Sequence, residues 1–163
     1  MKFAFEQRFA HPLADVQRAL LDENFIASMA TLPKLGAPEV LGREVAGAVV
    51  TLRVRYAFTG DLSASVRRVV DPTKLTWVEL SVTDTSAHTA TFTILPDNYG
   101  SLLKCSGTYE LTTAGNGAAR EARGEVRVNV PLFGGKVERA IVQGMQEHAQ
   151  AEAELVDSWL HDY

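Results

Sequence analysis

The last thirty or so residues of the chain constrain its fold more than any other segment. From Phe133 to about His161 there is no proline, and Ala, Glu and Gln, which favour helix, are abundant. Apolar residues recur there at helical spacing and form one stripe. The stripe consists of Val137, Ile141, Met145, Ala151, Leu155 and Trp159. One long amphipathic helix is therefore predicted, and a large apolar surface must lie opposite its stripe.

Alternating apolar and polar residues before this helix predict a run of half-buried strands. The predicted strands are 2–10, 39–46, 49–58, 74–83, 88–95, 102–112 and 119–130. Glycines at Gly47 and in 114–117 suit the tight turns between neighbouring strands. In strand 74–83 the apolar parity of Val78, Leu80 and Val82 is expected to face the interior.

Two short helices are expected between the first and second strands. Pro12 suits the first turn of one helix, and Asp15 favours its positive end. Residues 23–32 carry a second helical stretch, which Pro33 and Gly36 end. The order predicts a single α+β domain over residues 1–163, with an antiparallel sheet of about seven strands covered by the C-terminal helix.

Charge and cysteine content narrow the functional classes. The net charge is −4 and the sequence pI about 5.6, which argues against a nucleic-acid partner. Cys105 is the single cysteine, so no intramolecular disulfide is possible and a reducing compartment is favoured. No signal peptide or membrane-spanning segment is evident, and a cytoplasmic location is expected.

Particular segments resemble a known superfamily. They are Phe3-Ala4-Phe5, Pro12, Val16, the stretch 130–138 (VPLFGGKVE) and the helix end 154–160 (ELVDSWL). With the element order, they resemble the START and birch-pollen-allergen superfamily, also called SRPBCC or polyketide cyclase-like, which has the helix-grip fold. A narrower resemblance is to an uncharacterised, largely actinobacterial family. The resemblance implies a curved sheet wrapped around the long helix, with a cavity for a small apolar molecule between them.

Side chains predicted to face this interior form the candidate ligand-binding site. They are Val54, Tyr56, Leu80, Phe92, Tyr109, Val128, Ile141, Met145, His148 and Glu152. His148 and Glu152 lie four residues apart on the helix stripe, so their side chains meet. Such a pair can act as acid and base, can orient a ligand, or can simply be solvated at the rim. No residue is assigned a catalytic role on this basis.

The remaining chemical signals favour structural interpretations. Cys105 has no cationic neighbour in sequence and is interpreted as a small apolar side chain. Gly134-Gly135 lacks the spacing of a phosphate-binding loop and is interpreted as a sharp turn into the helix. The histidines are scattered, so no metal site and no cofactor are predicted.

Three functional hypotheses follow. The leading one is a non-catalytic binder or carrier of a small hydrophobic molecule, such as a lipid, isoprenoid or polyketide-like compound. The second is a cyclase, aromatase or hydratase that uses His148, Glu152 and a tyrosine in the same cavity. The third is a co-chaperone-like or regulatory module that uses the outer surface. The sequence identifies no protein partner.

Overall fold

The computed structural model describes residues 1–162 and has the predicted element order. The N-terminal part contains β1 (Lys2–Phe9), α1 (Leu13–Leu20), α2 (Glu23–Ser28), the 3-10 turn η1 (Met29–Thr31), β2 (Glu39–Ala46) and β3 (Val49–Ala57). The rest contains α3 (Ala64–Arg67), the 3-10 turn η2 (Pro72–Lys74), β4 (Thr76–Asp84), β5 (Thr89–Pro96), β6 (Leu103–Ala114), β7 (Gly117–Val128) and α4 (Gly134–Asp162). The predicted strands are confirmed to within a few residues at each end.

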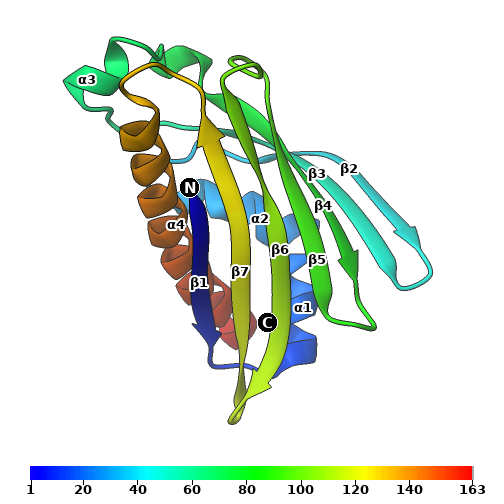
Figure 1. The fold of residues 1–163 in the computed structure, drawn as a ribbon. Coiled ribbons are helices and arrows are strands. Elements are labelled where there is room, and N and C mark those ends of the chain that lie inside the picture. Colours follow the sequence, from blue (N-terminus) through cyan, green and yellow to red (C-terminus); the bar gives the residue numbers. More distant parts are fainter. Residues whose placement is uncertain (163) are drawn as a thin grey trace.

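All seven strands form one antiparallel sheet in the order β1-β7-β6-β5-β4-β3-β2. From β2 to β7 each strand pairs with the next along the chain, and β1 closes the order against β7. This order brings the N-terminal strand beside the last strand, directly before the long helix (Figure 1). The α+β helix-grip fold predicted from the sequence is confirmed.

Helix α4 is continuous from Gly134 to Asp162 and is not interrupted at Gly144. It contacts β1, β7 and α1, and it runs alongside the β1–β7 edge of the sheet (Figure 1). The β2–β3 hairpin forms the opposite edge of the sheet and extends away from α4 (Figure 1). Helix α4 begins with two glycines, and a close backbone approach requires the first of them. A Cβ on Gly134 would lie 2.4 Å from the Val128 carbonyl oxygen. Within residues 1–162, no helix is long and apolar enough to cross a membrane.

The apolar interior consists of two clusters. One joins α1, α2 and the C-terminal half of α4 to β3, with Phe25, Val54 and Val156 among its buried members. The other joins β1, β5, β6 and β7 to the N-terminal half of α4, with Phe92 and Val126 at its centre. Burial of these side chains is the main favourable contribution to folding, at about 25 cal/mol per Å².

A pair of facing glycines makes room for the second cluster. Gly107 on β6 pairs with Gly124 on β7, on the face that carries Phe92 and Phe3. A Cβ on Gly107 would lie 2.8 Å from the Phe92 ring, and one on Gly124 would lie 2.6 Å from the Phe3 ring. Only glycine at both positions lets the two rings lie directly on the sheet.

The register of β4 corrects one prediction. Leu80 pairs with Arg53 and Thr93, and it therefore lies on the outer face of the sheet. Glu79 instead pairs with Val54 and Ile94, whose side chains face inward. The expectation that Leu80 faces the interior is wrong because β4 carries Val78, Leu80 and Val82 on its outer parity, whereas the inner parity holds polar residues and Trp77. That inversion defeats any assignment based on apolar parity.

Candidate functional site

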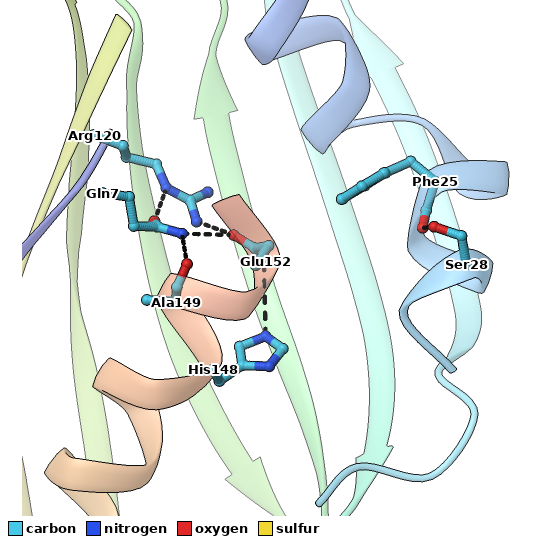
Figure 2. A network of polar contacts seen from close by, with 7 residues as sticks. All are labelled: Gln7, Phe25, Ser28, Arg120, His148, Ala149 and Glu152. Carbon is cyan, nitrogen blue, oxygen red and sulfur yellow. Dashed lines mark hydrogen bonds and ion pairs between the residues drawn. The ribbon is translucent and has the colours of Figure 1, made fainter. Parts of the chain in front are cut away.

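A polar network lies between the sheet and α4, on the inner face of the strands. Gln7 belongs to the inward parity of β1 and is 2% exposed. Its side-chain amide donates to the Ala149 carbonyl oxygen at 2.7 Å and to Glu152 Oε1 at 3.2 Å. Its amide oxygen accepts from Arg120 Nε at 2.7 Å. Gln7 thereby connects β1, β7 and α4 through one buried side chain (Figure 2).

Arg120 and Glu152 form the ion pair at the centre of this network. Arg120 Nη2 donates to Glu152 Oε1, and the two side chains are only 13% and 12% exposed. The Arg120 guanidinium also lies over the Tyr109 ring, with Cζ 4.5 Å from the ring centroid. Cation–π contact and an ion pair together fix the guanidinium in one position.

The network sets the charge of Glu152. Burial by itself would raise the pKa of this carboxyl, because desolvation disfavours the charged form. The Arg120 charge and the contacts with His148 and Gln7 outweigh burial and lower the pKa to about 2. Glu152 is therefore a permanent carboxylate at physiological pH.

His148 joins the network from one turn earlier on α4. Its Nε2 lies 3.6 Å from Glu152 Oε2, and its side chain is 29% exposed (Figure 2). Burial acts to lower the pKa of His148, but Glu152 overrides it and the net pKa is raised. The predicted pairing of the two side chains is confirmed, and His148 is the member of the pair that water reaches more easily.

Glu79 is a second carboxylate directed at the same interior, from β4. Burial and the Glu152 charge raise its pKa, and Arg120 and His148 only partly offset this. Glu79 is therefore close enough to Glu152, Arg120 and His148 for their charges to change its pKa. Among the described residues, however, none donates a hydrogen bond to Glu79 or forms an ion pair with it, and its side chain keeps partial contact with solvent.

Two tyrosines complete the polar lining. Tyr56 on β3 and Tyr109 on β6 face inward and are half-buried. Burial raises the pKa of both phenols far above its ordinary value, so both remain neutral. Within residues 1–162, neither hydroxyl makes a hydrogen bond. Both hydroxyls are therefore available as donors to a bound group.

The structure distributes the predicted site residues over both apolar clusters. Val54 and Tyr56 pack with the first cluster. Phe92, Tyr109, Val128, Ile141 and Met145 pack with the second cluster. His148 and Glu152 lie in the polar network, and Leu80 is outside on the other face. The assignment of the inward residues to ligand binding stays a prediction.

Three polar residues of the site escaped sequence analysis: Gln7, Arg120 and Glu79. Gln7 shares the parity of Phe3, Phe5 and Phe9, and Arg120 shares that of Val126 and Val128. A polar side chain on an otherwise apolar parity was the available signal for both residues. For Glu79 there was no such signal, because the apolar residues Val78, Leu80 and Val82 lie on the other parity of β4, which faces outward.

Other reactive groups do not extend the site. Burial raises the pKa of the Cys105 thiol to about 12, so it stays protonated. Within residues 1–162, no three His, Cys, Asp or Glu side chains are grouped to hold a metal ion. Two open surface hollows, of about 600 and 440 Å³, lie where β5 and β7 end and β6 begins. Of the predicted site residues only Val128 lines either hollow.

Solved structures of very different sequence share this fold. A Thermus thermophilus protein, TTHA0849, superposes with a TM-score of 0.69 at 20% identity, covering 97% of this chain and 95% of its own. The Zhui aromatase/cyclase from Streptomyces gives 0.59 at 14% identity, with 97% and 92% covered. Norcoclaurine synthase from Thalictrum flavum, in complex with dopamine and hydroxybenzaldehyde, gives 0.65 at 14% identity, with 100% and 87% covered.

At this level of identity the similarity establishes the fold. No curated protein matches the sequence. The chain belongs to the family described as a protein of unknown function, DUF2505, whose model matches residues 4–160.

Proposed function

We propose that this member of the DUF2505 family binds a small, mainly hydrophobic molecule between α4 and the inner face of the sheet. The observation that carries the proposal is the set of unbonded polar groups among inward apolar side chains. Glu79, Tyr56 and Tyr109 face the interior without hydrogen-bond partners in residues 1–162, beside Phe92 and Met145. A few oriented polar groups on an apolar wall are typical of small-molecule sites.

The polar network holds these groups in place. Arg120 is committed to Gln7, Glu152 and the Tyr109 ring, so it positions Tyr109 and is not itself free. We expect apolar burial to supply most of the affinity and the free hydroxyls and carboxylate to orient the ligand. Two proteins of this fold, an aromatase/cyclase and a norcoclaurine synthase in complex with dopamine and hydroxybenzaldehyde, support an aromatic or polyketide-like ligand.

The test uses the neutral fluorescent dye N-phenylnaphthylamine and two tryptophan substitutions on α4. Met145 packs against the second cluster, whereas Gln146, the next residue of the helix, is exposed. Met145→Trp fills the interior and should weaken dye binding by roughly tenfold or more, equivalent to about 1.4 kcal/mol. Gln146→Trp is the matched control and should leave it unchanged. Absence of dye binding, or equal effects of both substitutions, would contradict the proposal.

A second candidate function is catalysis in the same interior. It is favoured by the opposite pKa shifts of two carboxyls that share this space, lowered for Glu152 and raised for Glu79. Environments that separate two pKa values in this way assign acid and base roles in many enzymes. Recovery of a chemically converted compound after incubation, with turnover lost in Glu79→Gln, would favour the enzyme over the carrier.

A further inference from the structure

The surroundings of Glu79 specify more than a general apolar ligand. Glu79 pairs across the sheet with Val54, and the next inward residue on β4 is Trp77. Trp77 pairs with Tyr56, and their rings stack with centroids 6.0 Å apart at 24°. A carboxylate that makes no hydrogen bond or ion pair within residues 1–162 therefore lies beside an aromatic pair on the same face of the sheet.

The cations of the interior are committed to the other carboxylate. Arg120 bonds to Gln7 and Glu152 and lies over Tyr109. His148 lies next to Glu152, and no cation of residues 1–162 forms an ion pair with Glu79. A carboxylate removed from bulk water is costly unless a positive charge or hydrogen-bond donors meet it. Arg120 and His148 act on Glu79 only through their charge, and within residues 1–162 no side chain or backbone N–H donates a hydrogen bond to its carboxylate.

We propose that Glu79, with the Tyr56–Trp77 pair, binds the protonated amine of the ligand. This inference rests on the proposed function and names the chemical class of its ligand: an amphipathic amine with an apolar body. The ammonium donates to the Glu79 carboxylate, and the Tyr56 and Trp77 rings provide π surface for a cation. The apolar body lies along the inward side chains of the sheet.

The experiment measures the affinities of three matched compounds by calorimetry at neutral pH. 4-Phenylbutylamine, 4-phenylbutanol and 5-phenylpentanoate share one phenylbutyl body and carry a cation, a neutral hydroxyl and an anion. Because a hydrogen bond between charged groups is stronger than a neutral one, the amine should bind about tenfold more tightly than the alcohol. 5-Phenylpentanoate should bind most weakly, since its carboxylate meets the like charge of Glu79.

Three variants separate the possible causes. In Glu79→Gln the preference for amine over alcohol should fall to within about twofold, a difference below 1 kcal/mol. Glu110→Gln removes the same charge from an exposed position on β6 and should keep the preference. Trp77→Leu leaves the carboxylate in place and should reduce amine affinity by roughly threefold or more, the scale of one cation–π contact. Circular dichroism confirms that each variant is folded.

Two outcomes overturn the inference. One is a wild-type protein that binds the alcohol or the acid at least as tightly as the amine. The other is a Glu79→Gln protein that retains the amine preference. If either occurs while the neutral dye still binds and Met145→Trp still weakens it, the amine assignment fails and the proposed ligand-binding function stands. If the dye does not bind either, the proposed function fails as well.

Discussion

Glu152 and Glu79 are two carboxylates that share one interior and differ in almost everything else. Glu152, on α4, meets Arg120, Gln7 and His148, and its pKa is lowered to about 2. Glu79, on β4, has no bonded partner among residues 1–162, and its pKa is raised. The first carboxylate is part of the scaffold, whereas the second is open to an incoming group.

The difference indicates where this fold separates stability from function. Along the β1–β7 edge, α4 packs against the sheet and the polar groups satisfy one another. Toward β3 and β4, Glu79 and the hydroxyl of Tyr56 face inward without hydrogen-bond partners among residues 1–162, beside the stacked rings of Tyr56 and Trp77. Unbonded inward polar groups lower the stability of the protein without ligand. Such groups are expected at a site where a bound ligand supplies their hydrogen-bond partners.

The largest predicted effect comes from breaking the satisfied side of the comparison. Glu152→Gln leaves the buried Arg120 guanidinium without its counter-charge and should lower the free energy of unfolding by about 3–5 kcal/mol. Urea denaturation followed by circular dichroism measures this. Glu154→Gln, an exposed carboxylate on the same helix, is the control and should change it by less than about 0.5 kcal/mol. A loss below about 1 kcal/mol in Glu152→Gln would show that the ion pair is not structural.

Acid titration sharpens the same contrast. The pKa of Glu152 is lowered on folding, so its contribution is fully present above its unfolded pKa of 4.5 and disappears as the pH falls toward about 2. A shift of this size corresponds to roughly 3 kcal/mol, lost over that interval. Denaturation curves collected across the interval should show this loss in the wild type. The Glu152→Gln variant should lack it, and parallel pH profiles for the two proteins would refute the assignment.

The architecture was accessible from sequence because it depends on long, regular patterns. The stripe of α4 and the alternation in β3 and β6 each extend over many residues, so local exceptions do not hide them. The site was only partly accessible. His148 and Glu152 could be paired from helical spacing, but the spatial proximity of Gln7 and Arg120 depends on the pairing of β1 with β7. The inward position of Glu79 was missed because Val78, Leu80 and Val82 share one apolar parity of β4, which was expected to face inward but faces outward, with Val82 39% exposed.

Removal of the buried amide should have an intermediate effect. Gln7→Leu keeps the apolar volume but takes away the donor to the Ala149 carbonyl and the acceptor for Arg120. Buried groups left unsatisfied cost about 2 kcal/mol, so the free energy of unfolding should fall by that amount. Gln143→Leu, on the exposed face of α4, is the matched control. If both variants are equally stable, Gln7 does not connect the three elements.

The most direct test of the central contrast is the stability of Glu79→Gln at neutral pH, measured beside Glu152→Gln. The pKa of Glu79 is raised on folding, so the folded wild type loses stability as the pH rises through its titration, and the neutral amide avoids that loss. The variant should be more stable than the wild type by about 0.5–1 kcal/mol, the usual gain at a site kept for function. The gain should vanish at acidic pH, where Glu79 is protonated in both states. A Glu79→Gln protein destabilised by more than about 1 kcal/mol would instead identify Glu79 as a structural group and contradict the account.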